Sequence, residues 1–195
     1  MTKIQLMKEF DSIWYHYKTH FIVGILVIAA LVPLVFFDKD QKTSALNVTV
    51  IGNTIGQKEQ QSLQREASSK ILKADSKSEI KLNFWQLNGQ ITSSANVDLF
   101  QKLLAQITAK NIDIIPIDKN DFLLLSQQKA FIKLDSIKKL NNDKTSNKYG
   151  IDITGNEILR NAGYDTENKM MAILSNTERE ETAIKFVQWI TNEYP

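Results

Sequence analysis

Residues 45–51, ALNVTVI, decide the fold of this chain because their β-branched side chains predict a β-strand. Residues 52–56, GNTIG, then carry the glycines and short polar side chains of a turn. Residues 57–74 follow with apolar side chains three and four positions apart, which is the spacing of an amphipathic helix. A strand, a turn and a helix in this order begin an α/β unit.

The same alternation continues downstream. Further strands are predicted at 80–84, 112–117 and 170–174, with a shorter one at 149–154, and further helices at 97–107, at 120–129 and after a capping box at Thr177–Glu180. Strands that alternate with helices predict an α/β domain over residues 45–195, with a mostly parallel sheet flanked by helices. A segment of about 150 residues is long enough for one compact domain.

A run without charged residues lies upstream, at residues 21–37, FIVGILVIAALVPLVFF. As a helix it would be about 26 Å long, close to the thickness of the hydrocarbon layer of a bilayer. A buried core helix and a cleavable signal peptide are the alternatives. The run ends in Phe36 and Phe37 without the small residues of a cleavage site, so we predict a single uncleaved transmembrane helix.

The residues on either side of this run fit a membrane anchor. Side chains that favour the membrane interface precede it directly: Trp14, Tyr15, Tyr17 and Lys18. Residues 1–20 also place apolar side chains along one helical stripe, which predicts an interfacial helix, a contact with a neighbouring subunit, or an extension of the anchor. The lysines slightly favour a cytoplasmic N-terminus, so a polar stalk at 38–44 is predicted to lead to an extracellular domain of a single-pass cell-membrane protein.

Composition excludes several classes of function. Lysines and arginines number 24 and acidic residues 22, and both signs are interspersed, which argues against a nucleic-acid-binding surface. The absence of cysteine excludes disulfides, thiolate metal sites and a cysteine nucleophile. The two histidines, His16 and His20, precede the apolar run, so the domain after it has neither a Ser-His-Asp triad nor a histidine-ligated zinc site. We predict no catalytic residues, no metal site and no cofactor.

Several polar and aromatic residues allow two interpretations. Asp113, Asp118 and Asp121 lie near a strand end and a helix start, where carboxylates usually cap the helix. A converging pair of them would instead suit acid–base chemistry or a hard metal ion. Trp85 fits either stacking on a ligand or partial burial in the core, and burial is the favoured interpretation.

Two loops form the predicted binding surface. In open α/β sheets, ligands gather outside the carboxyl ends of parallel strands, where the strand order reverses. If the first and third predicted strands are parallel neighbours, the loops that follow them meet at one edge. We predict that this edge binds a ligand or partner through Gly52, Asn53, Thr54, Asp118, Lys119, Asn120 and Asp121. The alternative is that both loops are solvated turns.

Residues 111–137, NIDIIPIDKNDFLLLSQQKAFIKLDSI, resemble part of the first lobe of type 2 extracellular solute-binding proteins. In that lobe a strand ending in Asp is followed by a short helix, an apolar residue and Leu-Asp. Phe131, Leu134 and Asp135 match this pattern, whereas Lys129 stands where a glycine is usual.

The tail extends this resemblance, whereas the length of the chain departs from it. Ile13, Trp14 and Tyr17 ahead of one apolar run look like uncharacterised membrane-anchored proteins of Gram-positive bacteria that carry such a domain. The segment between Leu140 and Met170, where a second lobe would be inserted, is too short to hold one. The resemblance therefore implies a single lobe without its partner.

Three functions follow as expectations. The first is a non-enzymatic, membrane-anchored extracytoplasmic interaction module, an accessory subunit of a membrane or cell-envelope complex. Its partners would be the lipid bilayer and a membrane or cell-envelope protein, and not nucleic acid. The second is an accessory protein of a transporter that captures or senses a small solute. The third, a cell-wall hydrolase, ranks lowest because the domain lacks histidine and cysteine.

Overall fold

The computed structural model describes residues 17, 19–20, 22–27, 43–72, 77–134 and 147–191. The chain divides into two units, Met1–Lys42 and Thr43–Pro195. The described residues of the first unit are helical, and Tyr17 among them is exposed. A search of the described residues finds no helix that combines the length and the apolar character needed to cross a membrane. Most of the apolar run, the tail with Trp14, Tyr15 and Lys18, and most of the stalk lie outside the described residues, so the transmembrane helix stays a prediction.

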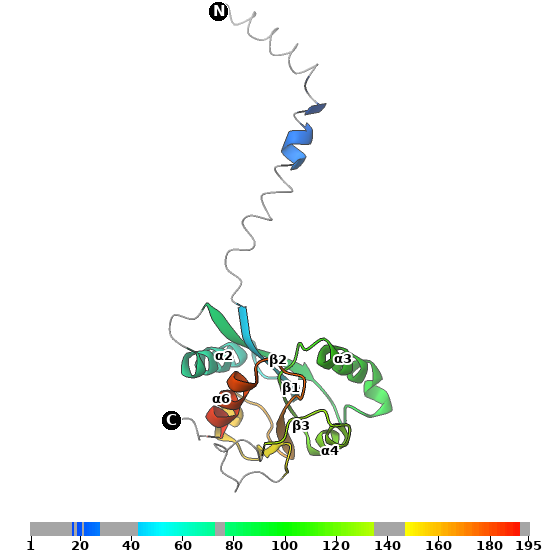
Figure 1. Cartoon of the computed structure of the whole chain (residues 1–195), viewed down its shortest axis with the longest axis vertical. Helices are drawn as coiled ribbons and strands as arrows, with labels where there is room; N and C mark the ends of the chain where they lie inside the picture. The colour runs from blue at the N-terminus through cyan, green and yellow to red at the C-terminus, as the bar shows by residue number, and fades with distance from the viewer. Residues whose placement is uncertain are drawn as a thin grey trace, which may run out of the picture. The chain divides into compact units, whose positions relative to one another are not determined.

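The second unit is an α/β domain built on one sheet (Figure 1). Its elements in chain order are β1 (Thr43–Gly52), α2 (Gln57–Ile71), β2 (Ser78–Gln86), η1 (Ser94–Asn96), α3 (Val97–Thr108), β3 (Ile114–Asp118), α4 (Lys119–Gln127), β4 (Ile151–Asp152), α5 (Glu157–Asn161), β5 (Lys169–Ile173) and α6 (Glu180–Ile190). The predicted strands and helices of this domain are therefore present. The five-residue helix α5 was not predicted.

The sheet is mixed, and the prediction of a mostly parallel sheet is wrong. Its strand order is β2-β1-β3-β5-β4. Strand β1 is parallel to β2 and β3, whereas β5 is antiparallel to both β3 and β4. The physical reason lies between β4 and β5, where α5 has five residues and rises only about 8 Å. So short a helix cannot return the chain across the sheet, as a parallel connection requires, and the chain reverses at the same edge.

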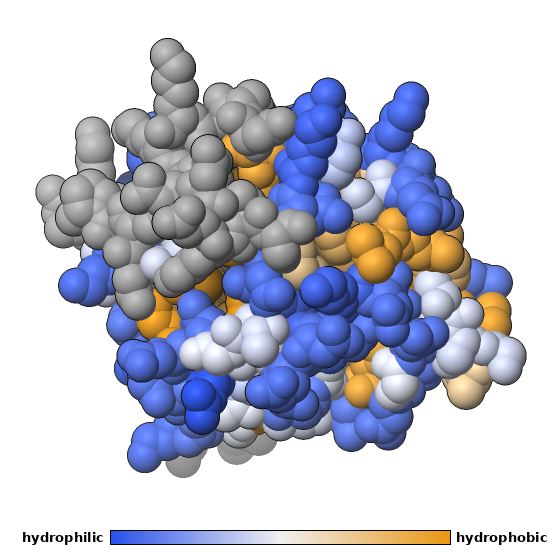
Figure 2. All heavy atoms as spheres, turned by 90° about the horizontal axis from the view of Figure 1, so that it is seen from below, coloured by the Kyte–Doolittle hydropathy of each residue, from blue (hydrophilic) through white to orange (hydrophobic). Residues whose placement is uncertain are grey.

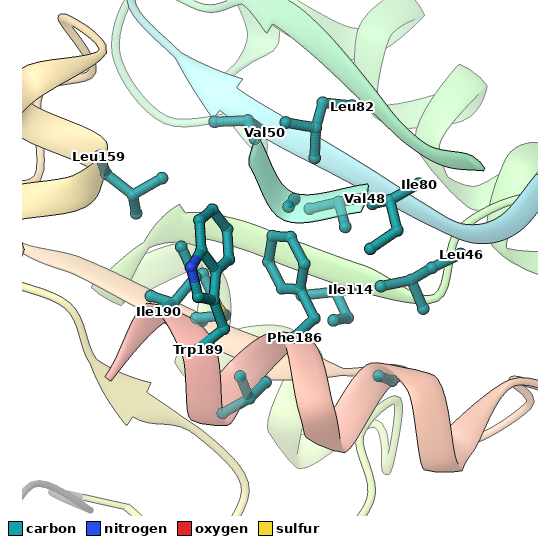
Figure 3. Close-up of a cluster of buried hydrophobic side chains, with 14 of the residues drawn as sticks. Leu46, Val48, Val50, Ile80, Leu82, Ile114, Leu159, Phe186, Trp189 and Ile190 are labelled. Carbon is teal, nitrogen blue, oxygen red and sulfur yellow. The ribbon is translucent and has the colours of Figure 1, made fainter. Parts of the chain in front are cut away.

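Helices cover both faces of the sheet, so β1, β3 and β5 are largely buried on both sides, whereas the outer strand β2 leaves Lys81 and Asn83 exposed. On one face, α2, α5 and α6 enclose a core that includes Leu46, Val48 and Ile114 of the strands. Figure 3 shows Phe186 and Trp189 of α6 directed toward these strand residues. On the other face, α3 and α4 enclose a second core that includes Leu103, Phe122 and Ile115. Adjacent residues of β3 thus serve different cores, as the two-residue period of a strand requires.

The ends of several elements differ from their predictions. Strand β1 already begins at Thr43, within the predicted stalk. Helix α6 begins at Glu180 and its N-cap residue is Arg179, so Thr177 does not form the predicted capping box. The hydroxyl of Thr177 instead donates a hydrogen bond to Asp113 (2.5 Å) and accepts one from the N–H of Arg179 (3.0 Å). A long-range partner has therefore displaced the local cap.

Two lysines end α3 and α4 in the left-handed region of backbone space. Lys110 has φ 57° and Lys129 has φ 59°. Glycine adopts this conformation without strain, and it is the usual residue just after a helix end. Lys129 is the position at which the family resemblance leads one to expect glycine, and its backbone retains that conformation.

Side chains of α2 reach the outer border of β2. The N–H of Ile80 donates to the hydroxyl of Ser68 (3.1 Å), and the N–H of Leu82 donates to Oε1 of Gln64 (3.3 Å). These two strand groups point away from β1, and they are satisfied by a helix rather than by another strand.

Candidate functional site

The carboxyl ends of β1 and β3 meet at one edge of the sheet. The two strands are parallel neighbours, with Val48 opposite Ile114. From β1 the chain crosses through α2 to β2 on one side, and from β2 it returns through α3 to β3 on the other side. The strand order therefore reverses between β1 and β3, and this is the position at which open α/β sheets bind ligands.

The side chain of Tyr164 occupies the space at this reversal. It is 2% exposed, and its hydroxyl donates a hydrogen bond to the carbonyl oxygen of Ile51 (2.8 Å). Its ring lies against Gly52, where an added Cβ would be 3.0 Å from Cε2 of the tyrosine. Gly52, predicted as a binding residue, therefore provides room for Tyr164.

Asn53 holds the backbone on both sides of Tyr164. Its Nδ2 donates to the carbonyl oxygen of Gly163 (2.8 Å), and its Oδ1 accepts from the N–H of Asp165 (2.8 Å). Both polar groups of the Asn53 amide are thus engaged within the chain. Thr54, the third predicted residue of this loop, is exposed.

Asp118 connects the end of β3 to the start of β5. It caps α4 by accepting from the N–H of Asn120 (3.0 Å), which agrees with the capping interpretation. It also accepts from Nδ2 of Asn168 (3.2 Å) and forms an ion pair with Lys169 (3.7 Å). The segment 163–169 is therefore fixed at one end by Asn53 and at the other by Asp118.

Lys119 extends this polar edge toward β4. Burial acts to raise the pKa of Asp152, but hydrogen bonds from Thr154 and the charge of Lys119 outweigh it, so this pKa lies below its ordinary value. The backbone N–H of Thr154 donates to the Asp152 carboxylate at 2.9 Å. Lys119 and Asp152 thus place opposite charges beside the segment that carries Tyr164.

Asp121 and Asp113 lie away from this edge, so the three aspartates do not converge. Asp121 is buried and accepts from the N–H of Ile91 (2.9 Å) and the hydroxyl of Thr92 (3.0 Å), which fixes the loop before α3. Asp113 lies at the opposite end of β3. Within the described part of the chain, no three His, Cys, Asp or Glu side chains are grouped so that they could hold a metal ion.

Asp113 is the most completely buried carboxylate of the described domain. It is 0% exposed and accepts from the N–H of Asn47 (2.7 Å), from the hydroxyl of Thr177, and from Nη1 of Arg179 (3.3 Å). These partners come from β1 and from the segment before α6. Asp113 therefore joins three segments that are far apart in the sequence.

Trp85 and Gly56 are both in contact with other side chains of the same domain. Trp85 is half-buried against the second core, and Nζ of Lys102 lies 4.4 Å from its ring centroid. Gly56 is the N-cap of α2, and the Glu59 carboxylate folds back onto it so closely that a Cβ there would overlap it. The start of α2 is thus already covered by an anion of its own chain.

An open pocket of about 380 Å³ lies on the outer side of the segment that carries Tyr164. It is lined by Arg160 and by residues 163–167. The sequence predicted that the loops after β1 and β3 meet at one edge of the sheet, but not that Tyr164 lies there, since nothing local marks the residues after α5 as partners of β1. The glycine at position 52, after a run of large strand residues, was the available signal.

The ionisation of Tyr164 yields a prediction about pH. Burial raises the pKa of its phenol above the ordinary value of 10.0, and the charges of Asp165 and Asp118 raise it further. Because the folded-state pKa is the higher one, the stabilisation from this group is complete below pH 10.0 and is lost as the pH rises above it. We expect the melting temperature to fall above pH 10.0 more steeply for the wild type than for Tyr164→Phe, and equal slopes would contradict this.

Comparison with known proteins identifies no family for this chain. No protein-family model and no curated protein matches the chain. Among solved structures it is similar to an extracellular solute-binding protein family 1 from Alicyclobacillus acidocaldarius subsp. acidocaldarius DSM 446, with 17% identity and a TM-score of 0.37. The match covers 58% of this chain and 28% of that protein, so the chain spans far less than its full length.

Proposed function

We propose that this protein is a membrane-anchored, extracytoplasmic interaction module without catalytic activity. The observation that carries the proposal is the position of Tyr164. The crevice in which an open α/β sheet would receive a solute is occupied by a side chain of the same chain, hydrogen-bonded to Ile51 and enclosed by Gly52 and Asn53. A domain with this crevice filled is better suited to present its outer surface than to enclose a ligand.

The anchor rests on the sequence of residues 21–37 and on their distance from the domain. Only residues 38–42 separate the apolar run from Thr43, the first residue of β1. Five residues span at most about 18 Å when fully extended. A domain on so short a connection stays beside the bilayer, where it would contact other proteins of the same membrane.

Capture of a small solute is the second candidate. It is favoured by the open pocket of about 380 Å³ beside Tyr164, where the Arg160 guanidinium and the Asp165 and Glu167 carboxylates could bind a polar molecule. The two functions differ in a measurable way, because a captured solute raises the melting temperature of the purified chain once its concentration exceeds its dissociation constant.

The first test determines the membrane topology of the chain. Because the sequence contains no cysteine, a single introduced cysteine is the only site that a maleimide can label. We expect Gln61→Cys, at an exposed position of α2, to react with a membrane-impermeant maleimide on intact, wall-stripped cells. Thr2→Cys should react only after lysis, because the tail is predicted to be cytoplasmic. Ala67→Cys, at a position that is 0% exposed, serves as the control that reports whether the domain is folded. The reverse labelling pattern, or a mature protein that begins after residue 30, would contradict the proposal.

A further inference from the structure

The exposed hydrophobic side chains of the domain are confined to two helices. Within the described part of residues 43–191, the large apolar side chains that are exposed all lie on α3 and α4: Val97 (46%), Leu104 (38%), Leu123 (42%) and Leu124 (39%). Both helices already bury other residues against the sheet, namely Leu103, Phe122 and Leu125. The exposed four are therefore not needed by the second core.

Helices α3 and α4 pack against the same core, on one face of the sheet. Figure 2 shows hydrophobic side chains gathered in a band on the right of that view, the side on which Figure 1 places α3 and α4. Hydrophilic side chains project beside the band. We call the surface of Val97, Leu104, Leu123 and Leu124 the α3–α4 face.

The charged residues around this face are mostly basic. The segments 97–110 and 119–129 contain the lysines Lys102, Lys110, Lys119 and Lys129, and the aspartates Asp98 and Asp121. Asp121 is buried and hydrogen-bonded inside the domain, and Lys119 is half-buried near Asp152. The exposed charges of the two segments are therefore Lys102, Lys110 and Lys129 with Asp98. Lys110 forms an ion pair with Glu178 at 2.6 Å, but the two side chains are 52% and 72% exposed. Such exposed ion pairs are weak, so Lys110 can readily leave Glu178 for another anion.

The short connection to the apolar run limits what can cover this face. Helix α3 has twelve residues and is about 18 Å long, which is similar to the longest reach of residues 38–42. If residues 21–37 are the anchor, the start of β1 lies within this reach of the bilayer. Because the connection is short, the lipid surface has a high effective concentration at this face, which favours it over a partner that diffuses freely.

We propose that the α3–α4 face docks on the anionic lipid surface of the bilayer to which the chain is anchored. The exposed leucines and Val97 enter the headgroup region, while the lysine side chains remain beside the lipid phosphates. This inference rests on the proposed anchoring, because it is the anchor that brings the face to the lipid. A bilayer is favoured over a protein partner because a lipid surface needs only apolar and basic side chains, which this face supplies.

The test uses the full chain in vesicles with a fluorescent NBD probe on a single introduced cysteine. Gln127→Cys reports on the α3–α4 face, since it is an exposed residue of α4, and Ser69→Cys on α2 is the matched exposed control. Ala30→Cys, in the apolar run, reports on the anchor. Vesicles contain phosphatidylcholine alone or with an equal amount of phosphatidylglycerol, and a lipid with a quencher near the headgroup is added.

We expect the probe at position 127 to shift to shorter wavelength and to be quenched in phosphatidylglycerol vesicles, while the probe at position 69 stays unchanged. Lys129→Gly should weaken this docking about fivefold, because it removes one basic side chain near the surface. Its φ of 59° is one that glycine adopts readily, so the variant should remain folded. Lys70→Ala, which removes a charge from α2 on the other face, should leave the docking unchanged.

The outcomes separate the two proposals. If the probe at position 30 is in hydrocarbon but the probe at position 127 behaves like that at position 69, the docking is overturned and the anchor stands. If the probe at position 30 is not in hydrocarbon, the proposed anchoring fails. An unquenched probe at position 127 overturns the docking in either case, and equal quenching with and without phosphatidylglycerol overturns the role of the lysines.

Discussion

Replacing Asp113 with alanine is expected to lower the free energy of unfolding by about 3–5 kcal/mol, because each buried donor left without its acceptor costs about 1–3 kcal/mol. The carboxylate is 0% exposed and receives hydrogen bonds from Asn47, Thr177 and Arg179. Its removal leaves these donors facing a space that alanine cannot fill. The loss should also loosen the segment before α6, because Thr177 and Arg179 would no longer be joined to β3.

Urea unfolding of the full chain in detergent micelles, followed by circular dichroism, measures this effect. The control is Asp118→Ala, because that carboxylate is 20% exposed and its ion pair with Lys169 is longer, at 3.7 Å. Losing this cap and this partly buried pair should cost less, about 1–2 kcal/mol. Asp113→Asn should fall between the two, since it keeps an acceptor but loses the charge. If Asp113→Ala lowers the free energy of unfolding by less than about 1 kcal/mol, the hydrogen bonds of Asp113 do not hold β1, β3 and the segment before α6 together.

Replacing Tyr164 with alanine should lower the free energy of unfolding by about 3–5 kcal/mol, as for other large aromatic side chains removed from a core. The side chain is 2% exposed, and it supplies both a ring against Gly52 and a hydroxyl to Ile51. Tyr164→Phe should cost about 1 kcal/mol, because it removes only the hydrogen bond. Chemical unfolding measures both variants, and Tyr149→Ala, at a half-buried position, is the matched control.

Two further measurements tie this loss to the crevice between β1 and β3. In a double-mutant cycle, Gly52→Ala should be much less harmful in the Tyr164→Ala background, because the added Cβ then no longer meets the ring. The tyrosine analogue p-cresol should raise the melting temperature of Tyr164→Ala more than that of the wild type, as apolar cavities bind small aromatic molecules. Additive effects in the cycle, together with no response to p-cresol, would mean that Tyr164 does not fill the crevice.

The secondary structure of this domain could be predicted because its signals are local. The β-branched run at 45–51 and the apolar periodicity of 97–107 both reappear as elements, β1 and α3. Strand direction could not be predicted in the same way. The reversal at β5 depends on the short helix α5, whose five residues carry too little periodicity to be recognised.

The meeting of the two loops was predictable, but the contacts that they make were not. The parallel pairing of β1 and β3 brings their two loops to one edge, as expected from the alternation of strands and helices. What the sequence could not reveal is that Asn53 and Asp118 would be engaged by residues 163–169, since such contacts span long distances in the chain. The same limit applies to Asp113 and Thr177, where a distant hydrogen bond replaced the predicted local cap.

The contacts between α2 and β2 have a consequence for growth of the sheet beyond one molecule. Strand β2 is an outer strand of nine residues, and unpaired groups on such a strand can recruit a strand from another chain and start aggregation. Ser68 and Gln64 already bind the outward N–H groups of Ile80 and Leu82, so an incoming strand would first have to displace both. At the opposite border, β4 has two residues and offers almost nothing to pair with. Copies of the domain at high local concentration could therefore collide often without polymerising edge to edge.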